Sequence, residues 1–226
     1  MVDPPGPPVP LADRKTAGEQ LAERLLHYRD QSPVVLALPR GGVPVAFEIA
    51  QRLNAPLDVL IVRKVGAPSN PEYGLGAVVE GGTRFLDEPR IHAAGYTVRD
   101  LGPTIAREAA EVERRAQEYR AGKPAAELRD RTVILVDDGV ATGGTVLAAL
   151  RAVRLREPRR IVLALGVAPP DTVDTLRPEV DDLVVLLVPS VFFAVGEWYH
   201  RFSQVSDGEV RRLLERSRTP STLPGS

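Results

Sequence analysis

The sequence predicts an α/β fold with a central, mostly parallel sheet flanked by helices. Short apolar runs that do not alternate with polar residues are typical of strands buried on both faces, and they occur at residues 34–38, 57–62, 132–136, 160–165 and 183–188. Helical patterns separate several of these runs, and strands that alternate with helices form parallel sheets. With 226 residues and 43% hydrophobic content, the chain can build one substantial core. We therefore expect a single folded domain.

The predicted elements follow one another as strand, glycine-containing loop and helix. Those of the first half are a helix that starts with the capping-box spacing of residues 16–19 and ends near Tyr28, a strand at 34–38, a turn at 39–42, a helix to about Leu53 and a strand at 57–62. Those of the second half are a charged helix at 105–120, a strand at 132–136, a helix at 146–154, and strands at 160–165 and 183–188.

Both ends of the chain are expected to lie outside this fold. Residues 1–11 are rich in proline, and residues 217–226 are small and polar, so neither segment can bury much apolar surface. We expect both to be disordered tails around a domain at residues 12–216.

Composition excludes several classes of protein. Lys and Arg (29) nearly balance Asp and Glu (30), so no overall positive field attracts nucleic acid or an anionic membrane. The absence of cysteine excludes disulfides, thiolate metal sites and cysteine nucleophiles. The N-terminus does not resemble a signal peptide, and no apolar run is long enough to span a bilayer. We expect a cytoplasmic protein without a nucleic-acid or membrane partner.

The stretch at residues 133–147 carries the clearest chemistry. A buried strand delivers Asp137 and Asp138 to its C-terminal end, where open α/β sheets bind ligands. The following loop, which includes Gly143 and Gly144, opens directly into a helix, and backbone N–H groups at a helix start attract anions. Hydroxyls from the same loop add donors. Carboxylates beside a phosphate-binding loop suit a phosphorylated sugar, because a carboxylate accepts hydrogen bonds from two hydroxyls.

Two other interpretations of the acidic pair are a helix cap and a magnesium site like that of P-loop enzymes. A P-loop is absent, because Gly122 and Lys123 are followed by Pro124 instead of Ser or Thr. No dinucleotide-binding G-x-G-x-x-G follows a strand either. Taken whole, the sequence VDDGVATGGT at residues 136–145 closely resembles the phosphoribosyl diphosphate (PRPP) motif of type I phosphoribosyltransferases. The resemblance covers residues 12–210 in order and spacing.

This resemblance implies a Rossmann-like fold with a small hood region and assigns several site residues. It implies that Asp137 and Asp138 contact the ribose hydroxyls and, with Lys64, serve catalysis. The 5′-phosphate is then expected at Ala141, Thr142, Gly143, Gly144 and Thr145, and the pyrophosphate at Arg40, Gly41 and Gly42. Mg²⁺ is expected to be held mainly through the substrate, with Asp137 and Asp138 as candidate ligands. The chain is expected to form a homodimer.

Arg63 and Lys64 follow the second predicted strand. They are similar to an Arg-Lys pair that meets the diphosphate in adenine and orotate phosphoribosyltransferases; the alternative is an exposed basic strand end. The loop at residues 67–76, which contains glycine and proline, is a candidate for the lid that such enzymes close over the sugar.

Residues 188–199 are similar to the hood of hypoxanthine-guanine enzymes, where an aromatic ring stacks on the base. Counting back from Gly196 selects Phe193, and counting forward from Pro189 selects Phe192; either ring could instead fill the core or a dimer interface. Ala141 replaces an aspartate of those enzymes that acts on the base. Their purine-recognising lysine has no counterpart near residues 167–168. The phosphate loop is closer to the adenine type, but the YGLG sequence at 73–76 lacks that family's fuller pattern.

The sequence thus predicts a phosphoribosyltransferase that uses PRPP and Mg²⁺ and an unidentified nitrogenous, purine-like acceptor, with release of pyrophosphate. One alternative is a regulatory protein that senses PRPP or a nucleotide on the same fold without turnover. Another is a phosphosugar hydrolase, for which no residue is assigned as the base that activates water.

Overall fold

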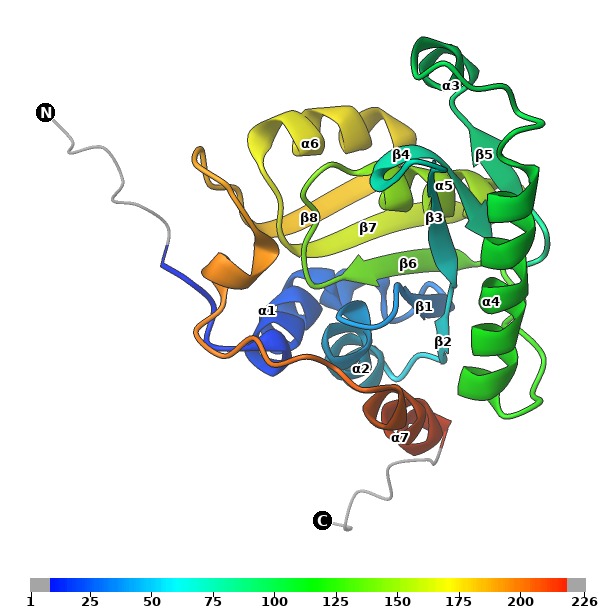
Figure 1. Cartoon of the computed structure of the whole chain (residues 1–226). Coiled ribbons are helices and arrows are strands. Elements are labelled where there is room, and N and C mark those ends of the chain that lie inside the picture. The colour runs from blue at the N-terminus through cyan, green and yellow to red at the C-terminus, as the bar shows by residue number, and fades with distance from the viewer. Residues whose placement is uncertain (1–8, 219–226) are drawn as a thin grey trace, which may run out of the picture.

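The centre of the molecule is a parallel sheet, as predicted (Figure 1). The structure is a computed structural model and describes residues 9–218. In the order β2-β1-β6-β7-β8, the strands are β2 (Leu57–Val59), β1 (Pro33–Ala37), β6 (Thr132–Asp137), β7 (Arg160–Val167) and β8 (Asp182–Leu187). Ala37, the last residue of β1, is in register with Val59 of β2 and Val136 of β6. The loops that follow β1 and β6 therefore meet at one edge of the sheet.

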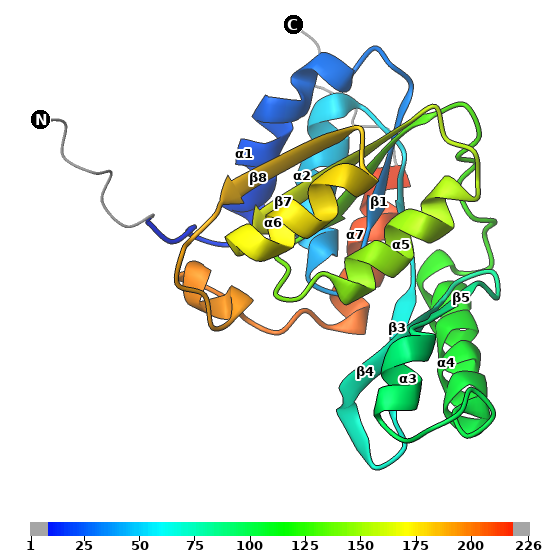
Figure 2. The same cartoon turned by 90° about the horizontal axis from the view of Figure 1, so that it is seen from above.

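Helices cover both faces of this sheet (Figures 1 and 2). One face carries α1 (Arg14–Leu25), α2 (Gly42–Leu53) and α7 (Asp207–Arg218), and the other carries α5 (Gly144–Arg154) and α6 (Pro170–Leu176). Short 3-10 helices lie at Leu26–Tyr28, Arg177–Glu179 and Val195–Trp198. Successive side chains of β1 enter opposite cores, with Val35 and Ala37 in one and Val34 and Leu36 in the other. This two-sided burial explains the unbroken apolar runs. No helix within residues 9–218 is long and apolar enough to cross a bilayer.

A second unit, which we call the arm, extends from the sheet (Figure 2). It consists of β3 (Val62–Ala67), β4 (Asn70–Val79), β5 (Arg84–Leu86), α3 (Glu88–Ala93) and α4 (Gly102–Arg120). Its strands form an antiparallel sheet in the order β3-β4-β5. The arm packs on the central core through buried side chains of α4, among them Ile105 and Val112.

The arm divides a segment that the sequence predicts as one strand. Residues 57–62 separate into β2, which belongs to the central sheet, and the start of β3, which belongs to the arm. Arg120 accounts for the break, because its Nη2 donates to the carbonyl of Val59 (2.7 Å) while its Nε pairs with Asp58 (2.9 Å). The same guanidinium pairs with Glu80 at the end of β4. A buried arginine thus joins the arm to the sheet.

The segment expected to be a lid loop is mostly regular structure. Residues 67–76 form the turn and first half of a β3–β4 hairpin, with an irregular register in which Gly66 pairs with Gly74. Glycine is needed at position 66, because a Cβ there would lie 2.2 Å from the carbonyl oxygen of Pro71. Close backbone approach between β3 and β4 explains the glycine at this position.

The domain boundaries differ slightly from those expected. Leu11 is buried and its N–H donates to the carbonyl of Trp198 (2.9 Å), so the ordered chain starts before residue 12. The first helix starts at Arg14 and is capped by Asp13, not by the predicted capping box: Oδ1 of Asp13 accepts from the N–H of Thr16 (2.8 Å), which lowers the pKa of Asp13 to about 2. At the other end, α7 continues to Arg218, beyond the expected boundary at 216. The rest of the two expected tails, residues 1–8 and 219–226, lies outside the described residues.

Candidate functional site

The candidate site is centred on the two aspartates at the end of β6. Asp138 is buried, with 8% of its surface exposed, and its backbone N–H donates to Oδ1 of Asp137 (2.9 Å). Burial and the neighbouring charge of Asp138 raise the pKa of Asp137 well above the ordinary range of an aspartate. The fold therefore holds two carboxylates together at a cost in electrostatic energy.

Residues from both ends of the chain hold Asp138 in place. Nε of Arg14, in the first turn of α1, donates to Oδ2 of Asp138 (2.7 Å), and its guanidinium lies 3.8 Å from the centre of the Phe202 ring. The hydroxyl of Tyr199 donates to the backbone carbonyl of Asp138 (2.5 Å). Burial raises the pKa of Tyr199, which keeps this hydroxyl protonated. These contacts were missed at the sequence level, because no local pattern links positions that are 124 residues apart.

The turn after β1 lies directly against the acidic pair. A Cβ on Gly41 would lie 2.1 Å from Oδ2 of Asp138, and one on Gly42 would lie 2.6 Å from the carbonyl oxygen of Val136. Only glycines allow this approach. The peptide bond between Pro39 and Arg40 is cis. Arg40 makes no ion pair with any carboxylate of the described chain, so its donors face the site without a competing partner.

These groups surround one cavity of about 440 Å³. Its walls are Arg14, Arg40, Gly41, Asp137, Asp138, Phe202, Ser203, Gln204 and Val205. The two carboxylates and the Arg40 guanidinium thus border the same cavity. The structure brings the predicted sugar-binding pair and the predicted pyrophosphate turn together.

The loop after β6 is open to a ligand. Gly143 caps α5 with a φ of +77°, in the left-handed region that favours glycine. Ala141 and Thr142 precede Gly143 in the loop, and Gly144 and Thr145 are the first two residues of α5. A Cβ on Gly144 would meet nothing within 4 Å. An anion can therefore approach the free N–H groups at the start of this helix.

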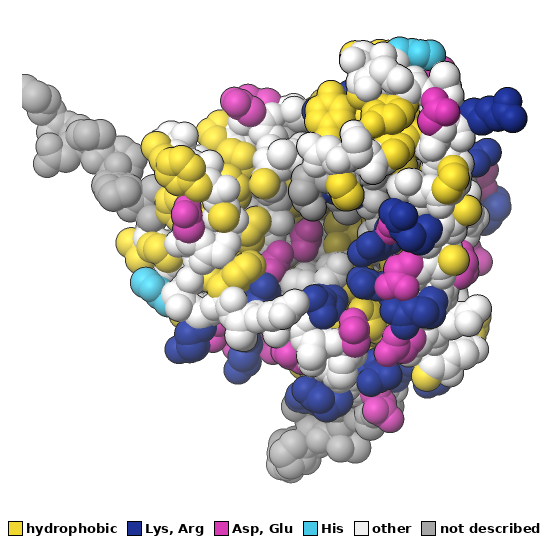
Figure 3. Space-filling view, in the orientation of Figure 1, with side chains coloured by type: hydrophobic (Ala, Val, Ile, Leu, Met, Phe, Trp, Pro, Cys, Tyr) yellow, Lys and Arg dark blue, Asp and Glu magenta, His cyan; other side chains and the backbone are white. Residues whose placement is uncertain are grey.

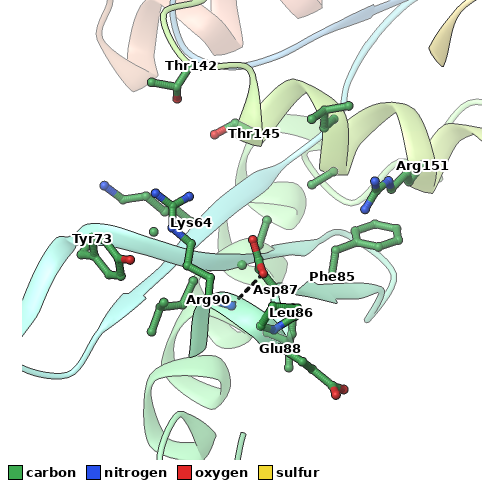
Figure 4. Close-up of a pocket in the computed structure, with 18 residues that line it drawn as sticks. Lys64, Tyr73, Phe85, Leu86, Asp87, Glu88, Arg90, Thr142, Thr145 and Arg151 are labelled. Carbon is green, nitrogen blue, oxygen red and sulfur yellow. Dashed lines mark hydrogen bonds between the residues drawn. The ribbon is translucent and has the colours of Figure 1, made fainter. Parts of the chain in front are cut away.

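A larger cavity of about 970 Å³, which we call the arm cavity, separates the arm from α5 (Figure 4). Lys64 of β3 lines it together with Thr142 and Thr145, so this predicted residue lies on the phosphate-loop side of the site. Arg63 does not share that cavity. Its Nε and Nη2 donate to Oε2 of Glu108 on α4 (both 2.9 Å), because neighbouring residues of a strand point to opposite faces. Of the predicted Arg-Lys pair, only Lys64 lines the arm cavity, although both residues border a smaller cavity of about 370 Å³ beside α4.

The two candidate hood aromatics have different environments. Phe192 is partly buried against the cluster that contains Leu11, Val167 and Tyr199, whereas Phe193 is 80% exposed. Neither lines the cavity at the aspartates or the arm cavity. Phe192 thus packs against the core cluster, whereas Phe193 is exposed on the surface.

The open face of the molecule is hollowed between the hood and the arm (Figure 3). Acidic side chains lie inside the hollow, and basic and acidic side chains are mixed along the arm. No group of three or more metal-ligating side chains occurs within residues 9–218. The acidic pair by itself is not a complete metal site.

An α/β sheet that presents an acidic pair, an arginine turn and an open glycine loop at one edge has the architecture of a type I phosphoribosyltransferase. The family model described as "Phosphoribosyl transferase domain" matches residues 13–197, and the chain belongs to this family.

Relatives and solved structures agree with this assignment. The chain is 42% identical over 205 residues to two Mycobacterium tuberculosis proteins, one of them named "Putative phosphoribosyl transferase Rv0571c". That match covers 91% of this chain but only 46% of the relatives, so the chain spans about half their length. The crystal structure of TT1426 from Thermus thermophilus is 45% identical, has a TM-score of 0.80, and is matched over 92% of this chain and 99% of its own.

Proposed function

We propose that the protein binds PRPP with Mg²⁺ and transfers 5-phosphoribose to a nitrogenous acceptor, with release of pyrophosphate. One observation carries the proposal: the acidic pair after β6 and the arginine turn after β1 border a single cavity beside an open phosphate-binding loop. PRPP has a group for each of these parts, namely vicinal hydroxyls, a diphosphate and a 5′-phosphate.

Each part of the site has a role that follows from its chemistry. Asp137 and Asp138 accept hydrogen bonds from the ribose hydroxyls. The loop at residues 141–145 binds the 5′-phosphate through N–H groups and threonine hydroxyls. Arg40 donates to the diphosphate, and Lys64 approaches the substrate from the arm.

The residues present fit a magnesium ion that is held largely by the substrate. Mg²⁺ in phosphate-binding sites takes one or two carboxylates and completes its shell with phosphate oxygens and water. Asp137 and Asp138 would supply the carboxylates, and burial together with the neighbouring charge of Asp138, which raise the pKa of Asp137, favour a cation beside this pair. When bound with the substrate, the ion supplies positive charge to the diphosphate leaving group.

In the proposed reaction, the bond between ribose C1 and a diphosphate oxygen breaks, and a bond from C1 to the acceptor nitrogen forms. The bonding electrons leave with the diphosphate, and the acceptor nitrogen gives up its proton to the released diphosphate or to water. Arg40 stabilises the charge that grows on the leaving group. The carboxylates lie where they can stabilise positive charge on the sugar. No covalent intermediate with the protein is required.

The acceptor, assembly and location are part of the same proposal. The exposed ring of Phe193 supports a flat, purine-like acceptor at the hood. The homodimer rests on the family resemblance, and the cytoplasmic location rests on the cysteine-free composition. Light scattering on the purified chain tests the dimer.

The function is tested by incubating the full chain with Mg²⁺, PRPP and a panel of purine, pyrimidine and amine acceptors while pyrophosphate is measured. Release that requires one acceptor and yields its ribosylated product supports the transferase. Release without any acceptor indicates a hydrolase. Binding of PRPP in calorimetry without turnover on any acceptor overturns the transferase and favours the sensor.

A paired variant tests the site itself. Asp137→Asn with Asp138→Asn should abolish measurable PRPP binding, because the amides lose the charge that attracts hydroxyls and Mg²⁺. Asp174→Asn is a matched control, since Asp174 is an exposed aspartate of α6. Unchanged affinity in the double variant contradicts the assigned site.

A further inference from the structure

The arm cavity has several basic side chains, of which the proposed chemistry uses only Lys64. Its lining includes Lys64, Arg90 and Arg151. Figure 4 shows the Arg90 and Lys64 side chains converging at the end of the cavity where Thr142 and Thr145 lie. Arg151 lies toward the other end, beside Phe85. Two cations from the arm therefore face the loop expected to hold the 5′-phosphate.

Arg90 is held in position, but its donors are not used in an ion pair. Its guanidinium lies 4.9 Å from the centre of the Tyr73 ring and pairs with no carboxylate of the described chain. The backbone around it is fixed by Asp87, which caps α3 by accepting from the Arg90 N–H (3.0 Å), and by Ile91, which is fully buried. A surface stack of this kind contributes little to stability.

Two other arginines of the arm have a structural explanation. Arg63 pairs with Glu108, and Arg120 joins Asp58 to Glu80. Arg90 has no such explanation, although its planar set of donors suits a phosphate. The charge of Asp87 attracts the guanidinium, but the Asp87 carboxylate accepts from the Arg90 backbone N–H and forms no ion pair with the Arg90 side chain. The Glu88 side chain points away from Thr142 and Thr145 in Figure 4.

We propose that Arg90 binds the phosphate of a sugar 5-phosphate held on the loop at residues 141–145, so that the phosphate is contacted from both walls of the arm cavity. The loop contributes N–H groups and hydroxyls, and the arm contributes Arg90 beside Lys64. Tyr73 is a positioning residue that holds the guanidinium by stacking. This inference rests on the proposed function, because it assumes a sugar phosphate at this loop.

The test uses ribose 5-phosphate, which carries the 5′-phosphate but no diphosphate, alongside PRPP with Mg²⁺. We expect Arg90→Gln to weaken the binding of both ligands about ten- to a hundred-fold in calorimetry, the range for loss of a hydrogen bond to a charged group. Arg90→Lys should recover part of the affinity. Tyr73→Leu should cause a smaller loss, because the charge remains but its orientation is less fixed.

Arg151→Gln is the matched control. It removes the same charge from the same cavity, about 9 Å further along α5 than Thr145 at 1.5 Å per residue. We expect unchanged affinity. Equal weakening by Arg151→Gln and Arg90→Gln overturns the inference, because it shows a general field effect instead of a contact.

The outcomes separate this inference from the proposed function. If the unaltered protein binds neither ligand, the proposed function fails, and the inference fails with it. If the unaltered protein binds both and Arg90→Gln binds them equally well, only the inference fails. If Arg90→Gln weakens PRPP alone, Arg90 contacts the diphosphate, and the assigned subsite is wrong.

Discussion

The ion pair between Arg14 and Asp138 gives the sharpest prediction for stability. Both side chains are 11% exposed, and Nε and Oδ2 are 2.7 Å apart. Arg14→Met keeps an unbranched side chain against Phe202 but leaves the Asp138 carboxylate without its cation. Removal of one partner of a buried pair costs about 3–5 kcal/mol, and partial exposure reduces this to about 2–4 kcal/mol. For a chain of this size, the thermal midpoint should fall by about 5–15 °C.

The assay is urea unfolding of four proteins: the unaltered chain, Arg14→Met, Asp138→Asn and the double variant. We expect the double variant to be more stable than the sum of the single losses predicts, with a coupling energy of about 1–3 kcal/mol. Lys15→Met is the control, because Lys15 pairs with Glu19 at the surface, where such pairs contribute about 0–1 kcal/mol. An unfolding midpoint of Arg14→Met equal to that of the control, or strictly additive losses, refutes the reasoning.

Three further predictions concern the same site. Asp137→Asn should stabilise the ligand-free protein more at pH 8 than at pH 4. Because the pKa of Asp137 is raised in the folded state, the unaltered protein loses stability as the pH rises above the ordinary aspartate pKa, by about 1.4 kcal/mol for each pH unit between the ordinary and the folded pKa. Equal thermal midpoints of the variant and the unaltered protein at pH 8 contradict this. Gly41→Ala should lower both the PRPP affinity and the free energy of unfolding, because the new Cβ would overlap the Asp138 carboxylate. Gly102→Ala, which has open space around it, should change neither quantity when calorimetry and unfolding are measured in parallel. In urea unfolding, Phe192→Ala should lower the free energy of unfolding by about 2–4 kcal/mol and Phe193→Ala by less than about 1 kcal/mol, because only Phe192 is partly buried. Equal losses in the two variants contradict this.

The central sheet and the glycine-containing loops after β1 and β6 could be predicted because their signals are local. A strand buried on both faces has to be apolar at every position, as in β1 and β6, and the loops after these strands need glycine for close approach or a positive φ. These constraints act within a few residues. Parallel pairing then places both loops at one edge, so the site follows from the order of the elements.

Contacts between distant segments could not be predicted in the same way. The acidic pair is contacted by residues from distant parts of the sequence, namely Arg14 and Tyr199, with Phe202 packed on Arg14. Similarly, the strand at 57–62 is interrupted by Arg120, which enters from a helix 61 residues after Val59. A hydrophobic pattern records which residues are buried, but it does not record which polar side chain will satisfy a given carbonyl or carboxylate.

The distribution of charge in the cavity favours ligand binding over stability. If stability alone decided the arrangement, Arg40 would pair with Asp137, whose pKa is raised by burial and by the neighbouring charge of Asp138. Instead, Arg14 pairs with Asp138, while Arg40 borders the same cavity without a carboxylate partner in the described chain. The Asp137 carboxyl group and the guanidinium of Arg40 thus both border the cavity without an ion pair between them. A ligand with hydroxyls at one position and a diphosphate at another satisfies both, so its binding offsets an electrostatic cost that the fold alone leaves in place.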